Sequence, residues 1–281
     1  KKTIYYKRIL EVLEKPLSIL DPKNPTEFNH KNKEKNKINN VSFKYPNADD
    51  YVLKNISFTA NKGEMTAIIG STGSGKSTLI NLIPRFYDVT SGSVKVNGQD
   101  VREVKQTSLR DRIGYIPQKA LLFSGTIESN LKYAKEDATQ EELDKAIEIA
   151  QAKNIIQEKA GHYEEPISQG GTNVSGGQKQ RLSIARALVK NPDIYIYDDS
   201  FSALDYKTDA ALRAALEKDL SDKTLIVVAQ RISTIMNADQ IIVLNDGQVV
   251  GKGTHDELMD NCEVYREIAF SQLSKEELNH E

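Results

Sequence analysis

Apolar residues recur along this chain with two different spacings, and the spacing distinguishes strands from helices. Alternating or short continuous apolar runs predict strands at 41–45, 51–60, 63–70, 92–101, 193–199, 224–231 and 240–253. A period of 3.6 residues predicts helices within 77–87, 138–160 and 178–190. Parallel strands that alternate with helices predict an α/β fold, with an antiparallel patch near the start and a helical insertion between roughly 110 and 190.

Changes in composition and hydrophobic pattern along the chain also predict where the domain begins and ends. Residues 1–20 have apolar groups at helical spacing, and residues 21–40 are rich in Pro, Asn and Lys, as solvated linkers are. Patterned sequence runs over 41–272, and we expect 273–281 to be a polar tail. Because the chain opens on Lys1 and not on methionine, it is expected to be a piece of a longer protein.

Composition narrows the classes of function. The formal net charge is −2 and the pI is about 6.2, so no overall basic field favours nucleic acid as a partner. Cys262 is the single cysteine, which excludes an internal disulfide and favours a reducing compartment. The sequence contains no apolar stretch near the roughly 18 residues that a membrane span needs.

Residues 70–78 read GSTGSGKST and satisfy the phosphate-loop pattern G-x-x-x-x-G-K-[ST]. Glycines let successive backbone N–H groups turn towards phosphate oxygens, and the helix that follows adds its dipole. Lys76 can reach the β- and γ-phosphates, and the Ser77 hydroxyl can bind Mg²⁺. The loop follows a predicted buried strand and opens a predicted helix, so we expect a nucleotide site.

A second glycine-rich element, VSGGQKQR at 174–181, precedes an amphipathic helix. Ser175 can cap this helix, while Gly176 and Gly177 expose backbone N–H groups to an anion. The ordered set GSTGSGKST, YIPQ, VSGGQ, IYIYDDSFSALD, AQR and GTHDEL resembles the nucleotide-binding domain of an ATP-binding cassette (ABC) exporter over about residues 38–272.

This resemblance implies a P-loop NTPase core, with a mixed, mostly parallel sheet and an antiparallel β patch. It also implies an α-helical subdomain carrying the signature motif VSGGQ. Residues 1–20 would follow the last transmembrane helix. Two such domains would pair head to tail with ATP and Mg²⁺ between them. They would be joined to transmembrane domains of the same polypeptide at the cytoplasmic face of the membrane, with no nucleic acid as partner. The ATP-binding residues implied are Tyr45, Gly70, Ser71, Thr72, Gly73, Ser74, Gly75, Lys76, Ser77, Thr78, Ser175, Gly176, Gly177, Gln178 and Asp205.

Within the same resemblance, Tyr45 would stack on adenine, and Asp205 would signal across the dimer. Ser77, Gln118 and Asp198 would hold the metal, and Gln118 would also meet the attacking water. The family places a glutamate after the strand-ending aspartate and a histidine after the later strand. This chain has Asp199 and Gln230 at those catalytic positions.

Both departures weaken hydrolysis in physical terms. The aspartate carboxylate is withdrawn by roughly 1.5 Å, one C–C bond, and general-base catalysis depends on hydrogen-bond reach. A glutamine amide cannot carry the positive charge that histidine can. We therefore expect tight ATP binding with slow turnover, as in the degenerate site of a heterodimeric, multidrug-like bacterial exporter, where this chain's signature would complete the partner's site.

Two other interpretations remain open, and two more are disfavoured. The chain could be an active homodimeric ATPase in which Asp199 suffices, or a module that clamps ATP only to dimerise. A DNA-repair or translation ABC ATPase is disfavoured, because only about a hundred residues separate the phosphate loop from the signature, and the chain has one cassette. A GTPase is disfavoured because no N-K-x-D element for reading guanine is present.

Overall fold

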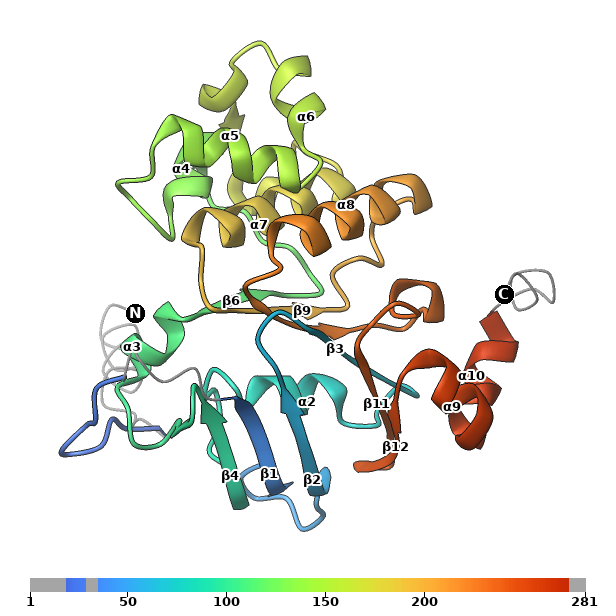
Figure 1. Cartoon of the computed structure of the whole chain (residues 1–281). Helices are drawn as coiled ribbons and strands as arrows, with labels where there is room; N and C mark the ends of the chain where they lie inside the picture. The colour runs from blue at the N-terminus through green and yellow to red at the C-terminus, as the bar shows by residue number, and fades with distance from the viewer. Residues whose placement is uncertain (1–18, 29–34, 273–281) are drawn as a thin grey trace, which may run out of the picture.

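A computed structural model describes residues 19–28 and 35–272, and its centre is a six-stranded sheet (Figure 1). The strand order is β12-β11-β3-β10-β9-β6; all neighbours pair in parallel except β12, which lies antiparallel at one edge. The strands are β3 (Met65–Gly70), β6 (Ile113–Ile116), β9 (Ile194–Asp198), β10 (Thr224–Val228), β11 (Gln240–Asn245) and β12 (Gln248–Gly253).

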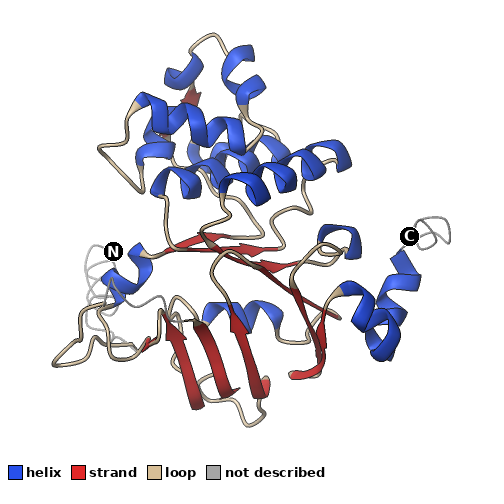
Figure 2. Ribbon diagram, viewed as in Figure 1, coloured by secondary structure: helices blue, strands red, loops and turns tan. Residues whose placement is uncertain are grey.

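A four-stranded antiparallel sheet covers one face of the central sheet, in the order β2-β1-β4-β5 (Figure 2). Its strands are β1 (Asn36–Phe43), β2 (Leu53–Ala60), β4 (Ser91–Val96) and β5 (Gln99–Asp100). Helix α2 (Lys76–Asn81) packs between the two sheets, with Leu79 and Ile80 fully buried in their shared cluster.

A group of helices covers the other face and extends away from the sheet (Figures 1 and 2). It consists of α4 (Ile127–Lys132), α5 (Gln140–Ile149), α6 (Lys153–Glu158), α7 (Gly176–Lys190), α8 (Tyr206–Asp219) and the small β7 (Gly125–Thr126)–β8 (Pro166–Ile167) ladder. The remaining elements are α3 (Gln106–Asp111), α9 (His255–Asn261), α10 (Glu263–Gln272) and the 3₁₀ turns η1 (His162–Glu164), η2 (Gln169–Gly171) and η3 (Ile232–Thr234).

The apolar runs of the central strands supply two cores at once, because successive side chains point to opposite faces. In β9, Tyr195 and Tyr197 join the cluster under the helices, whereas Ile194 and Ile196 join the cluster shared with the antiparallel sheet. A strand buried on both faces reads as a continuous apolar run, which is why the sequence signalled these strands clearly.

Two boundaries differ from the sequence expectation. Strand β1 begins at Asn36, inside the range 21–40 expected to be a linker, and β6 is a strand of the central sheet although it lies inside the range expected to be helical. Asn has low β propensity, but here Asn36 is buried and hydrogen-bonds Thr224 Oγ1 (3.1 Å) and the Asn97 amide (3.0 Å). These distant partners favour a strand that local composition does not indicate. The expected helix within 1–20 falls almost wholly, and the tail at 273–281 entirely, outside the described residues.

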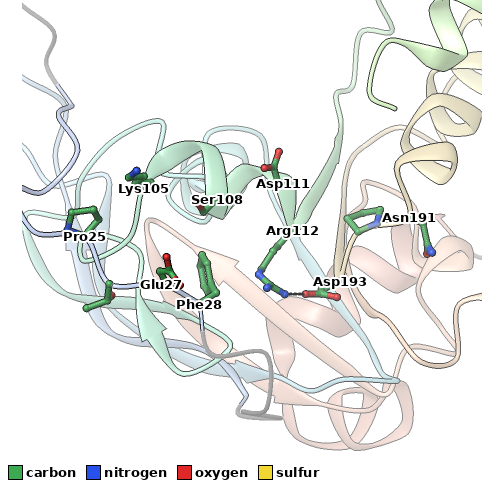
Figure 3. A pocket seen from close by; sticks show the side chains of 11 residues that line it. Pro25, Glu27, Phe28, Lys105, Ser108, Asp111, Arg112, Asn191 and Asp193 are labelled. Carbon is green, nitrogen blue, oxygen red and sulfur yellow. Dashed lines mark hydrogen bonds and ion pairs between the residues drawn. The ribbon is translucent and has the colours of Figure 1, made fainter. Parts of the chain in front are cut away.

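A cavity of about 560 Å³ separates residues 25–28 from α3 and the segment that follows α7 (Figure 3). Arg112 crosses it, with its guanidinium over the Phe28 ring at 5.0 Å and paired with Asp193. None of the residues expected at the nucleotide site lines this cavity.

Candidate functional site

The register of the central sheet gathers the candidate residues at one edge. Ile116 of β6 pairs with Tyr197 of β9, so Gln118 and Asp199 each lie two residues beyond a paired position. Val228 of β10 pairs with both Asp198 and Ile68, so Gln230 lies two residues beyond the ladder, while Gly70 ends β3 in its pair with Leu244 of β11. Since these strands are parallel, their carboxyl ends meet there, as is general for ligand sites in open α/β sheets.

The phosphate loop runs from the end of β3 to the start of α2. Gly73 and Gly75 have φ of +83° and +99°, conformations that favour glycine. A Cβ at Gly70 would lie 2.1 Å from the Leu244 carbonyl oxygen, so this position needs glycine for space. At Gly73 a Cβ would have nothing within 4 Å, which leaves that side of the loop open to a ligand.

Lys76 lies folded over this loop. Its ammonium donates to the carbonyl oxygens of Gly70 (2.8 Å) and Ser71 (2.7 Å). Burial lowers the pKa of Lys76, and the charges of Asp199 and Asp198 oppose that shift. The site therefore holds one cation beside two carboxylates.

Asp198 ends β9 and is held by two hydroxyl groups. Ser77 Oγ donates to Asp198 Oδ1 at 3.1 Å, and the Tyr115 hydroxyl lies 3.0 Å from Oδ2 and 3.1 Å from Asn81 Oδ1. Burial, followed by the charge of Asp198, raises the pKa of Tyr115, so its hydroxyl remains a donor. These contacts fix the Asp198 carboxylate next to the Ser77 hydroxyl.

The three residues expected to be catalytic lie together. Asp199 Oδ2 accepts from the Gln118 side-chain amide at 2.7 Å and from the Gln230 side-chain amide at 2.6 Å. Asp199 is 7% exposed and has φ of +48°, a conformation that aspartate tolerates better than most residues. Burial raises its pKa, the hydrogen bond from Gln118 lowers it, and the charge of Asp198 raises it again, so that the net shift is upward.

Tyr45 lies at the edge of this region, beside the first turn of α2. Its hydroxyl is 2.9 Å from Thr78 Oγ1, and its ring meets Phe43 and Tyr87 edge-on at 5.0 and 5.2 Å. The ring is half-buried, and this packing fixes its orientation next to the phosphate loop.

The signature element begins α7 as expected, and its side chains form a cap. Ser175 Oγ accepts from the Gln178 amide (3.2 Å), and Gln178 Oε1 accepts from the Ser175 amide (3.0 Å), a reciprocal capping box. A Cβ at Gly176 would have nothing within 4 Å. Within the described part of the chain, no hydrogen bond joins residues 175–178 to the phosphate loop, and Figure 1 shows α7 among the helices, on the opposite side of the central sheet from α2.

Asp205 caps the next helix, α8. Its Oδ1 accepts from the Thr208 amide (3.0 Å) and its Oδ2 from the Thr208 hydroxyl (2.7 Å). The backbone hydrogen bond from Thr208 lowers the pKa of Asp205. In this single chain Asp205 is thus an exposed helix cap.

The residues present fit Mg²⁺ and a polyphosphate. Ser77 and Asp198 supply oxygen ligands of the kind that Mg²⁺ prefers, and Gln118, whose NH₂ group donates to Asp199, has a side-chain carbonyl oxygen to offer as well. The N-terminus of α2 has no side-chain cap, so its backbone N–H groups can bind an anion. In the described ranges 19–28 and 35–272, no three His, Cys, Asp or Glu side chains form a cluster that could hold a metal ion.

Fold and site together define a P-loop nucleotide-binding domain. The chain belongs to the ABC transporter family, whose sequence pattern it matches over residues 53–202.

Relatives and a solved structure agree with this assignment. The chain is 46% identical over 275 residues to an uncharacterized ABC transporter ATP-binding protein of Mycobacterium bovis, covering 97% of this chain and 47% of the relative. It is 44% identical to a putative multidrug export ATP-binding/permease protein of Bacillus subtilis, covering 82% of this chain and 40% of the relative. A bacterial Atm1-family ABC exporter with ATP bound has a similar structure, with a TM-score of 0.91 and 33% identity over 97% of this chain and 47% of the exporter. The chain thus spans about half the length of the curated relatives it matches.

Sequence reasoning missed two groups that hold the site in place. Tyr115 lies in the YIPQ motif, but its link to Asp198 depends on β6 lying next to β9. Gln272, near the end of α10, donates to the Gln230 carbonyl oxygen and accepts from the Ile232 amide, and no motif marks it.

Proposed function

We propose that this chain is the ATP-binding domain of an ABC exporter, and that it binds Mg-ATP through its phosphate loop at a dimer interface to power export. Its own hydrolytic site turns over slowly. The observation that carries this proposal is that one oxygen of the Asp199 carboxylate accepts hydrogen bonds from two glutamine side-chain amides.

Two properties of Asp199 have opposite effects on its strength as a general base. Its raised pKa makes the carboxylate more basic, but its shorter side chain and doubly occupied Oδ2 reduce its reach towards a water molecule. Hydrogen-bond reach has to be satisfied before basicity contributes. We therefore infer that geometry dominates and the proton transfer is slow.

Gln230 weakens the same step. Its NH₂ group donates to Asp199, and a neutral amide offers no positive charge to the γ-phosphate. When bound, Mg²⁺ would polarise the phosphate oxygens, with Ser77 and Asp198 as its protein-side holders and Gln118 facing it. Lys76 would exchange its two loop carbonyls for phosphate oxygens.

The exposed signature supports a head-to-tail pair. Gly176 faces open space, and the chain's own phosphate loop does not contact it, so a second ABC subunit can present its nucleotide there. The match to exporters about twice as long supports a membrane domain as the other partner, with this domain at the cytoplasmic face. The structure contains, among its described residues, no helix both long and apolar enough to cross a bilayer.

The test compares Mg-ATP hydrolysis by the parent with that of the Asp199→Glu/Gln230→His variant, with ATP binding measured for both. A matched control makes the same two changes at exposed positions outside the site, Asp256→Glu/Gln157→His. We expect the parent and the control to bind ATP and hydrolyse it slowly, and the site variant to gain turnover. Brisk hydrolysis by the parent would favour the active homodimer, and a failure to bind ATP would overturn the assignment as a whole.

A further inference from the structure

The last helix of the described chain reaches the loop that carries Gln230. Gln272, in the last turn of α10, places its side-chain amide against the backbone on either side of Arg231. Its Oε1 accepts from the Ile232 amide at 2.9 Å, and its Nε2 donates to the Gln230 carbonyl oxygen at 2.7 Å. One side chain thus satisfies one N–H and one C=O, as a neighbouring strand would.

The loop is a segment that needs such support. The ladder of β10 ends at Val228, and the Ala229 amide still donates to the Ile68 carbonyl at 3.2 Å. From Gln230 the backbone is irregular until η3 begins at Ile232. Irregular backbone outside a sheet opens more readily than the strand before it.

Helix α10 is a firm base for Gln272. Tyr265 and Ala269 are fully buried in the cluster under the helices, which also contains Ile232 and Ile235. The Tyr265 hydroxyl lies 2.8 Å from His255 Nδ1, which ties α10 to α9. Because the helix is anchored one and two turns before Gln272, the glutamine is presented to the loop from a fixed direction.

We propose that Gln272 is a positioning residue of the hydrolytic site: it holds the backbone at Gln230 and so fixes the amide that Gln230 donates to Asp199. Gln272 contacts the Gln230 carbonyl oxygen and the Ile232 amide, and acts through Gln230. The inference rests on the proposed function, because it concerns the site where ATP would be hydrolysed. The last helix thereby becomes part of the hydrolytic machinery.

The first measurement reads the position of Gln230 directly, in the full chain. The side-chain NH₂ signal of Gln230 in a ¹⁵N NMR spectrum is assigned by its loss in Gln230→Ala. In Gln272→Ala we expect this signal to move towards the position of a free glutamine amide. Ser271→Ala is the matched control and should leave the signal in place, because among the described residues the Ser271 hydroxyl bonds only the Ile268 carbonyl oxygen of its own helix. Gln272→Glu keeps the acceptor for Ile232 and loses the donor to Gln230, so it should move the signal as well.

The second measurement is a double-mutant cycle on single-turnover ATP hydrolysis, which detects slow rates. Gln272→Ala should lower the rate about tenfold while the Kd for ATP stays within about twofold, because the loop is mispositioned but the phosphate loop is untouched. In the Gln230→Ala background the same change should have no further effect, since Gln272 acts through Gln230.

The two measurements separate the inference from the function on which it rests. An unmoved Gln230 signal in both Gln272 variants overturns the positioning role, and so does an effect on the rate that persists undiminished without Gln230. If the parent fails to bind ATP, the proposed function is wrong, while the NMR comparison still decides whether Gln272 positions Gln230.

Discussion

Asp199→Asn should make the nucleotide-free protein more stable at neutral pH. The Asp199 carboxylate is 7% exposed and lies beside Asp198, and its pKa is raised chiefly by burial. Its charged form therefore costs free energy in the folded state. Asparagine removes that charge, keeps a carbonyl oxygen for the amides of Gln118 and Gln230, and tolerates the φ of +48°.

The direction of the pH effect follows from proton linkage. With a folded-state pKa above the unfolded value of 3.8, the folded protein holds this proton more tightly than the unfolded chain does. Stability of the parent therefore rises as pH falls through the folded pKa and levels off below 3.8. The advantage of Asp199→Asn should be fully present above the folded pKa and should fade to zero as pH falls towards 3.8.

The expected gain in the free energy of unfolding from Asp199→Asn is modest. The two amide hydrogen bonds to Asp199 offset part of the cost of burying its charge, so we expect a gain of about 1 kcal/mol at pH 7. For a domain of this size such a change raises Tm by about 2–4 °C. Urea unfolding of the chain in EDTA, at several pH values between 4 and 8, measures it.

A matched control carries the opposite sign. Asp205 is exposed, and the backbone hydrogen bond from Thr208 lowers its pKa, so its charged form is stabilised in the folded state. Asp205→Asn should lower stability at neutral pH, and that loss should vanish as pH falls through the folded pKa. If Asp199→Asn lowered stability at pH 7, or its effect were the same at every pH, the charged Asp199 side chain could not be destabilising the folded state as inferred.

Two further predictions concern the scaffold. Tyr197→Phe should raise the free energy of unfolding by about 1–2 kcal/mol, because the fully buried Tyr197 hydroxyl has no partner among the described residues. A lower free energy of unfolding, measured in urea, would mean that the hydroxyl is hydrogen-bonded in the folded protein. Gly92→Ala should cost at least about 2 kcal/mol more than Gly73→Ala. Both glycines have φ of +83°, but a Cβ at Gly92 would lie 2.3 Å from the Asn40 carbonyl oxygen, whereas Gly73 faces open space. Equal losses from the two substitutions would contradict this reasoning.

The motifs mark residues that the structure brings together, because these residues lie at strand ends. The run IYIYDD predicts a buried strand that ends in carboxylates. The register of β6, β9 and β10 then brings Gln118, Asp199 and Gln230 together. Local sequence contains the strand and the polar residue that follows it. The order of strands in the sheet is a tertiary property, and it alone decides that the two glutamines meet the same oxygen.

What the sequence could not indicate depends on contacts between distant segments. Asn36 forms part of β1 because Thr224 and Asn97 satisfy its amide. Gln272 reaches the loop at Gln230 from a helix some forty residues later in the chain. Neither residue type predicts its role, since asparagine is poor in strands and a glutamine near the end of a helix is ordinarily solvated.

The register also explains why the side chains at the two positions that depart from the family pattern can be changed without disturbing the backbone around them. Asp199 lies just beyond the ladder, where its backbone amide donates a hydrogen bond to the Val228 carbonyl oxygen (2.9 Å), and the Gln230 carbonyl oxygen accepts one from the Gln272 side chain (2.7 Å). A longer carboxylate or an imidazole at these positions changes the reach and charge of the site but none of the pairs that place it. Restored turnover in Asp199→Glu/Gln230→His would therefore report on chemistry and not on refolding. For the same reason, a variant that stays silent while binding ATP would move the cause of slow turnover away from these two side chains.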